Sequence, residues 1–152
     1  MGIQKLKDHV KKQNLNLIYS IIISVLIVIF VEVINSNKFQ NPFWEITDGI
    51  SFFSGISLLI FALTPIMFGL ITTDKTGSVI VGVVPITSIL LYTNFISGSS
   101  MGMILKGIAY TGSLAVIGGV EGYLASTKRI EYIFIAVFLG ILWILVFLTC
   151  GF

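Results

Sequence analysis

The sequence contains very few of the residues that carry most metal and nucleophile chemistry in proteins. It has one cysteine, Cys150, and one histidine, His9, and only 11% of its 152 residues are charged. A single cysteine excludes an intramolecular disulfide and a cysteine cluster for a metal within one chain. Together the two counts also remove most zinc, haem and Cys/His nucleophile chemistry. We therefore expect no cofactor and no metal.

What remains is strongly apolar. The hydrophobic fraction is 56% and the mean hydropathy is +1.04, whereas soluble domains have about 45–50% apolar and about 25% charged residues. These values argue against a water-soluble fold, and the net charge of +2 gives no reason to expect a nucleic-acid partner. Because one crossing of the hydrocarbon needs about 20 residues, we predict a multi-pass protein of the cell membrane with the lipid bilayer as its surroundings.

Five apolar segments are long enough to be spans. We predict an all-α bundle of five transmembrane helices with antiparallel neighbours, at about residues 15–34, 49–72, 78–97, 101–124 and 130–148. Residues 15–152 would form one transmembrane domain, preceded by a basic cytoplasmic segment, 1–14, that is either an amphipathic helix on an anionic leaflet or a solvated tail. The first apolar run is longer than the roughly 7–15 residues of a signal-peptide core, so it is interpreted as an uncleaved anchor.

The basic residues of the short connections predict the orientation. With the N-terminus in the cytoplasm, that side holds most of the lysines and arginines, and only Lys38 and Lys106 lie on the other side. The positive-inside rule therefore favours N-in and C-out, which requires an odd number of spans.

Two prolines leave an alternative topology open. Pro65 and Pro85 interrupt the second and third apolar segments, where we expect helix kinks. The freed carbonyls would be satisfied by Ser/Thr side chains, with Thr64 and Thr87 placed to help, or by neighbouring helices. In the alternative, the hairpin that contains both prolines is re-entrant, and four spans remain.

The fourth segment carries regularly spaced small residues. They recur every four positions in two registers, Gly107, Thr111, Ala115 and Gly119 in one, and Gly118, Gly122 and Ser126 in the other. In lipid, such a surface allows another helix to approach closely. We predict helix packing along it, within the chain or, if it faces lipid, against a partner or a second copy.

Four ionisable residues at or near membrane depth are candidates for ion or proton handling. Glu32, Lys106 and Asp48 are expected near the outer ends of their spans, where they would form a cluster unless Lys106 merely snorkels to the interface. Glu121 follows Lys106 by 15 residues, roughly 22 Å along a helix, so the two cannot pair. Glu121 has glycines around it that are expected to leave room for its carboxyl group. It would either bind a proton or cation or pair with a basic residue of a cytoplasmic loop.

The sequence contains no catalytic motif in the context that its chemistry requires. Residues 98–102 match G-x-S-x-G, but they lack a neighbouring base and the strand-turn-helix context, and no nucleotide-binding P-loop is present. We therefore predict a protein that is not an enzyme, with the favoured role of a structural subunit or assembly partner of a larger membrane complex. The alternative is a small oligomeric permease or ion- or proton-conducting protein that uses Glu121, Lys106 and Glu32. A weaker third option is a lipid-modifying or lipid-binding protein that works at the cytoplasmic surface with its basic tail.

Overall fold

Five helices and one short β-ladder make up residues 2–35, 45–47, 50–96 and 101–150, which the computed structural model describes. The helices are α1 (Gly2–Asn35), α2 (Phe52–Thr72), α3 (Lys75–Ile96), α4 (Met101–Ser126) and α5 (Ile130–Cys150). Before α2, strand β1 (Glu45–Thr47) pairs antiparallel with β2 (Ile50–Ser51), with Thr47 opposite Ile50. The prediction of five helices in a helical fold is confirmed, whereas the small β-ladder was not anticipated.

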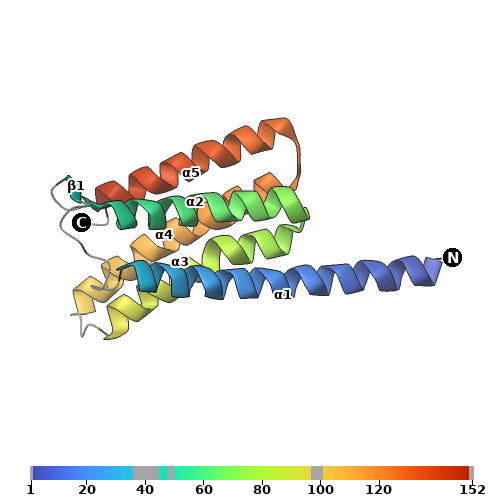
Figure 1. Ribbon diagram of the computed structural model, residues 1–152, viewed down its shortest axis with the longest axis horizontal. Coiled ribbons are helices and arrows are strands. Elements are labelled where there is room, and N and C mark those ends of the chain that lie inside the picture. The colour runs from blue at the N-terminus through green and yellow to red at the C-terminus, as the bar shows by residue number, and fades with distance from the viewer. Residues whose placement is uncertain (1, 36–44, 48–49, 97–100, 151–152) are drawn as a thin grey trace.

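The first helix is longer than its predicted span. It runs for 34 residues from Gly2 to Asn35, so the basic segment and the apolar segment form one continuous helix. Figure 1 shows its N-terminal part projecting beyond the other helices, and Lys11 and Lys12 are exposed there.

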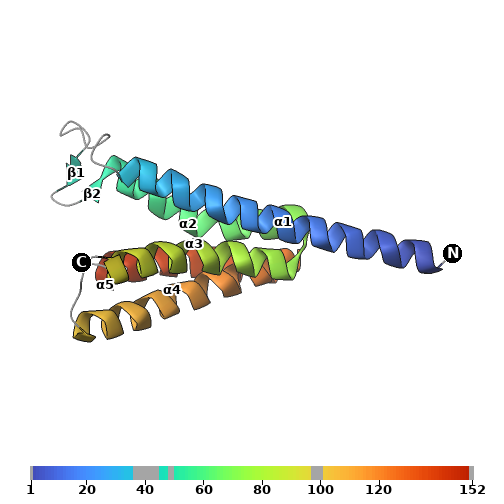
Figure 2. The same cartoon turned by 90° about the horizontal axis from the view of Figure 1, so that it is seen from below.

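Consecutive helices run antiparallel and alternate between the two ends of the bundle. The N-terminus, the α2–α3 turn and the α4–α5 turn lie at one end, and the C-terminus lies at the other (Figures 1 and 2). The largest contact is between α3 and α4; α4 also packs on α2 and α5, while α1 packs on α3 and α2.

Glycines allow the backbones of α3 and α4 to touch. A Cβ atom added to Gly82 of α3 would lie 2.1 Å from the carbonyl oxygen of Gly118 in α4, and one added to Gly122 would lie 2.6 Å from the carbonyl oxygen of Ser78. Because these distances are shorter than any van der Waals contact, only glycine fits at this crossing.

A second packing centre surrounds Trp143 of α5, whose side chain is fully buried. Its indole Nε1 donates a hydrogen bond to the carbonyl oxygen of Leu114 in α4 at 3.0 Å. Its ring stacks on Phe147, with the centroids 5.7 Å apart, and contacts Phe61 of α2 at 5.9 Å. Trp143 thereby joins α5 to both α4 and α2.

The outer surface of the helices is apolar, while several polar side chains are buried. Large hydrophobic residues are exposed on all five helices, and four of them form a stripe along α2: Leu59, Leu63, Met67 and Ile71. Five buried side chains donate a hydroxyl hydrogen bond to a backbone carbonyl one turn earlier in the chain: Ser20, Ser24, Ser78, Thr111 and Ser126. Two stretches, Val10–Val33 and Ile130–Thr149, are long and apolar enough to cross a membrane.

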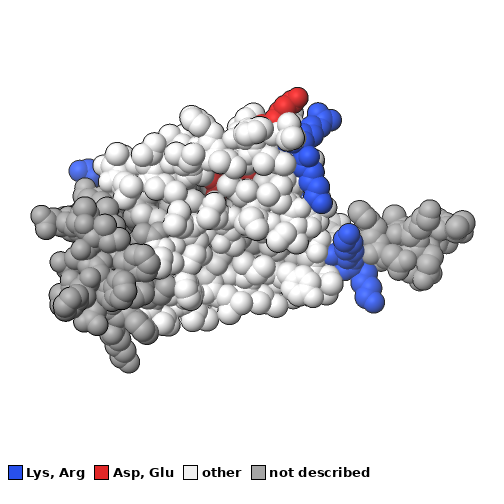
Figure 3. All heavy atoms as spheres, turned by 45° about the horizontal axis from the view of Figure 1, so that its top comes forward, with Lys and Arg blue, Asp and Glu red and all other residues white. Residues whose placement is uncertain are grey.

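The charged side chains gather at the ends of the bundle. In Figure 3 lysines and arginines cluster at the end where α1 projects, and the side of the bundle is mostly white. This end carries the two tight turns, α2–α3 and α4–α5. Thr73 and Lys128 make these turns with positive φ angles of 58° and 56°.

Helices α2 and α3 continue through their internal prolines, Pro65 and Pro85. The threonine near each proline bonds the carbonyl four residues before itself: Thr64 Oγ1 donates to Ile60 O at 2.6 Å, and Thr87 Oγ1 donates to Val83 O at 2.8 Å. A proline frees the carbonyl four residues before the proline. The two hydroxyls therefore bond other carbonyls than those freed, so the part of the prediction that assigned Thr64 and Thr87 to the freed carbonyls is wrong.

Candidate functional site

Glu121 lies in the interior of the bundle, where α4 faces α2 and α5. Its side chain is 0% exposed, and neither carboxyl oxygen has a hydrogen-bond partner among the residues that the structure describes. A Cβ atom on Gly140 of α5 would lie 3.4 Å from Glu121 Oε2, 3.4 Å from Cδ1 of Ile66 and 3.6 Å from the carbonyl oxygen of Ala62. The carboxyl group thus occupies space that Gly140 and Ala62 leave between α5 and α2.

The glycines around Glu121 have a different role from the one expected. Gly118 and Gly122 contact the backbone of α3, and Gly119 faces Val83 of the same helix. Residues at i and i+4 share one face of a helix, so this glycine face is directed to α3 while the Glu121 carboxyl group points to α5. The room for the carboxyl group comes from Gly140, which lies 19 residues later in the sequence.

The structure places the predicted small-residue positions of α4 against other helices of the same chain. Gly118, Gly119 and Gly122 are buried and lie against α3, and Thr111 and Ala115 are buried as well. Gly107 is half-buried and accepts a hydrogen bond from Thr111 Oγ1 at 2.6 Å. Gly118, Gly119 and Gly122 thus pack against α3 of the same chain.

The predicted outer cluster is not assembled by its two described members. Glu32 of α1 and Lys106 of α4 are both exposed, and no ion pair joins them. α1 packs against α2 and α3, whereas α4 packs against α2, α3 and α5. Asp48 lies outside the described residues, as do Gly98 to Ser100 of the G-x-S-x-G match.

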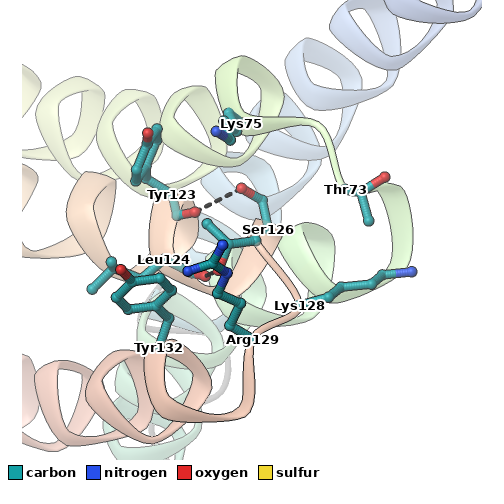
Figure 4. Close-up of a pocket in the computed structure, with 9 residues that line it drawn as sticks. Thr73, Lys75, Tyr123, Leu124, Ser126, Lys128, Arg129 and Tyr132 are labelled. Carbon is teal, nitrogen blue, oxygen red and sulfur yellow. Dashed lines mark hydrogen bonds between the residues drawn. The ribbon is translucent and has the colours of Figure 1, made fainter.

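The structure has a basic pocket at one end of the bundle that the sequence did not predict. It measures about 610 Å³ and lies where the α2–α3 turn, the end of α4 and the start of α5 meet; its lining residues are Thr73, Lys75, Tyr123, Leu124, Ser126, Thr127, Lys128, Arg129 and Tyr132. Figure 4 shows the side chain of Lys75 beside Tyr123 and that of Arg129 beside Tyr132. A signal for it was present, because two tyrosines flank the basic turn of residues 127–129.

Leu124 lines this pocket and follows Glu121 by three residues, about 4.5 Å along the axis of α4. It packs with Leu70 against a buried apolar cluster of Ile66, Ala125 and Ala136. The Glu121 carboxyl group itself lies deeper in the bundle, beside Gly140 of α5.

Comparison with known proteins assigns no family to this arrangement. No family model, no curated protein and no solved structure matches the chain. Among the described residues, no three histidine, cysteine, aspartate or glutamate side chains are grouped so that they could hold a metal ion. The chemistry of the site must therefore be inferred from Glu121 and its surroundings.

Proposed function

We propose that this chain is a five-span membrane protein that binds a proton or a small cation at Glu121 and conducts it across the bilayer. This proposal rests on one observation: the Glu121 carboxyl group is buried and has no hydrogen-bond partner among the described residues. Desolvating an ionisable group without compensation costs several kcal/mol. An apolar side chain would fill the same space without that cost, so a role for the carboxyl group itself explains its presence.

The dimensions of the helices support five crossings. Helices α2 to α5 contain 21, 22, 26 and 21 residues, which corresponds to about 31–39 Å at 1.5 Å per residue. This length matches a hydrocarbon core of about 30 Å. The exposed apolar stripe of α2 and the exposed Leu105, Ile108 and Val116 of α4 would then face lipid.

The charge distribution supports an orientation with the N-terminus inside. Lys11, Lys75, Lys128 and Arg129 are exposed and lie in α1 or at the α2–α3 and α4–α5 turns, at the same end of the bundle (Figure 1). Lys106 is exposed near the start of α4, toward the other end (Figure 1). Under the positive-inside rule the first end faces the cytoplasm.

The position of Glu121 suits exchange with the cytoplasmic side. Leu124 lines the polar pocket at that end and packs with Leu70 against the buried Ile66, Ala125 and Ala136. Movement of this apolar cluster would give water or a cation access to the carboxyl group. Away from the pocket, the carboxyl group lies between α5 and α2, where Gly140 and Ala62 have little or no side chain. A carboxyl group can carry a proton or offer oxygen ligands to a hard cation.

Carbodiimide labelling tests the chemistry of this site. A hydrophobic carbodiimide, which enters lipid and reacts with a protonated carboxyl group, should modify Glu121 in proteoliposomes and leave the Glu121→Gln variant unlabelled at that position. A water-soluble carbodiimide should instead modify the exposed Glu32 and Glu131. Slower labelling of Glu121 in sodium chloride than in choline chloride would identify a cation as ligand. Absence of any modification at Glu121 over the pH range in which the protein stays folded would contradict the proposal.

A second role, as a subunit of a larger membrane complex, is favoured by the outer face of α4. Ala109, Gly112 and Ser113 are exposed together, and a Cβ atom on Gly112 would meet nothing within 4 Å. Small residues on a lipid-facing surface allow another helix to pack closely. Affinity purification of the natively expressed chain in mild detergent tests this role. Co-purifying membrane subunits that a Gly112→Leu variant loses would support it, and recovery of the monomer alone would contradict it.

A further inference from the structure

The basic pocket described above carries three cationic side chains and no acidic one. Lys75, Lys128 and Arg129 line it, and no aspartate or glutamate is among its lining residues. Within the described part of the chain, none of the three forms an ion pair with a carboxylate. The nearest acidic residue before Lys75 is Asp74, whose Oδ1 accepts a hydrogen bond from the backbone amide of Thr76 at 3.1 Å and so caps α3.

Two of the cations are held in place by aromatic rings. Lys75 Nζ lies 5.1 Å from the ring centroid of Tyr123, and Arg129 Cζ lies 5.9 Å from that of Tyr132. A cation over an aromatic face is attracted to the ring but keeps its positive charge. These contacts therefore orient Lys75 and Arg129 while leaving their charge available to an anion (Figure 4).

The start of α5 contributes the partial positive charge of a helix N-terminus, although its first turn also contains the exposed Glu131, which is not among the pocket-lining residues. The backbone amide of Ile133 donates to the carbonyl oxygen of Arg129 at 3.0 Å, so the preceding amides of the first turn have no acceptor within the helix. Helix N-termini favour anions, phosphate groups in particular. Arg129 precedes this turn directly, and Lys128 precedes Arg129 with a positive φ angle of 56°. In Figure 4 the Lys128 side chain extends away from Arg129, so Lys75 and Arg129 are the cations closest to the two tyrosines.

Apolar residues are exposed on the outside of the bundle at the same end. Ile71 near the end of α2, and Ile130 and Phe134 at the start of α5, are each 72% exposed. Ile71 comes two residues before Thr73 of the pocket lining, whereas Ile130 and Phe134 lie on a different face of α5 from Tyr132. The acyl chains of a lipid whose phosphate occupies the pocket would therefore meet apolar surface on the outside of this end. Tyrosines such as Tyr123 and Tyr132 are typical of the membrane interface, the depth at which lipid phosphates lie.

We propose that this pocket binds the phosphate group of an anionic lipid in the leaflet at the basic end of the bundle. Basic pockets between helices on the cytoplasmic side are suited to such headgroups. The pocket of about 610 Å³ is shared by three segments, the α2–α3 turn, α4 and α5. A bound lipid would thus link the two turns that close this end of the bundle.

Native mass spectrometry of the full chain in detergent tests the proposal. The chain is titrated with phosphatidylglycerol and with phosphatidylcholine of identical acyl chains, and bound lipid is counted. We expect tighter binding of phosphatidylglycerol, and a loss of about fivefold in affinity for Lys75→Gln or Arg129→Gln, since each basic side chain near an anionic headgroup contributes on that scale. Arg129→Lys should recover part of the loss.

Lys11→Gln is the matched control, because Lys11 is exposed at the same end but does not line the pocket. Its affinity for phosphatidylglycerol should stay unchanged. Equal losses for Lys11→Gln and Arg129→Gln, or equal binding of the two lipids, would overturn the proposal. Displacement of the lipid by millimolar inorganic phosphate would identify free phosphate as the ligand and overturn the assignment to a lipid. Because Lys75 and Arg129 are exposed, their variants should keep the wild-type circular dichroism spectrum.

Discussion

Substitution of Gly82 by alanine is the sharpest structural test of the bundle. The added Cβ atom would lie 2.1 Å from the carbonyl oxygen and 2.4 Å from the carbonyl carbon of Gly118. Both are backbone atoms in the middle of a helix, so no flexible side chain can move aside. To bring 2.1 Å to the 3.4 Å of an ordinary contact, α3 and α4 must separate along the whole crossing.

The expected loss follows from this separation. Overpacking of a close contact typically costs about 1–3 kcal/mol, and here the loss should lie at the upper end or beyond, because the packing of α3 on α4 is the largest helix contact in the bundle. Gly112→Ala is the matched control. At that exposed position of α4 nothing lies within 4 Å of an added Cβ atom, so the better helix propensity of alanine should stabilise the protein by up to about 1 kcal/mol.

Unfolding of both variants is followed by circular dichroism as the denaturing detergent fraction of mixed micelles is raised. Gly82→Ala should unfold at a lower fraction than wild type, and Gly112→Ala at the same fraction or a higher one. Adding Gly118→Ala to Gly82→Ala should cost less than Gly118→Ala alone, because the helices are already apart. If Gly82→Ala is no less stable than Gly112→Ala, the α3–α4 contact described above is refuted.

Two further predictions concern α5 and the membrane topology. Trp143→Phe removes the hydrogen bond to the Leu114 carbonyl oxygen and part of a buried ring. In the same detergent titration it should lower the free energy of unfolding by about 1–3 kcal/mol. An unchanged midpoint would show that this contact does not stabilise the bundle. In a Cys150→Ser background, single cysteines at the exposed positions Thr73 and Gly102 should react with an impermeant maleimide from opposite sides of the membrane, and labelling from one side only would contradict the proposed α2–α4 topology.

Much of the fold could be predicted from the sequence because hydrophobic length and turn residues specify it locally. The run from Ile130 to Leu148 predicts one long apolar helix, and α5 occupies these residues in the structure. The small β-ladder before α2 could not be foreseen, since strands of three and two residues carry no periodic pattern. The start of α1 at Gly2 also escaped prediction, because its basic segment suits a helix and a solvated tail equally well.

The sites were less predictable because they depend on contacts between distant segments. Four-residue spacing in α4 indicates a packing surface, but its partner, Gly82 of α3, is one of many small residues and emerges only from the fold. Burial of Glu121 could be suspected from its apolar surroundings, whereas the space that Gly140 leaves for it could not. The basic pocket joins Lys75 to Arg129, which lie 54 residues apart, and no local pattern links them.

Ion flux through reconstituted protein tests the central claim most directly. Proteoliposomes that contain wild type, Glu121→Gln or Glu32→Gln at equal protein content are loaded with a pH-sensitive dye, and a membrane potential is applied with a potassium ionophore. A second set contains a sodium-sensitive dye and starts with a sodium gradient. The proposal predicts flux in one of the two sets for wild type and for Glu32→Gln, and a rate no higher than that of protein-free vesicles for Glu121→Gln. Equal flux in wild type and Glu121→Gln, or no flux of either ion in wild type, would contradict it.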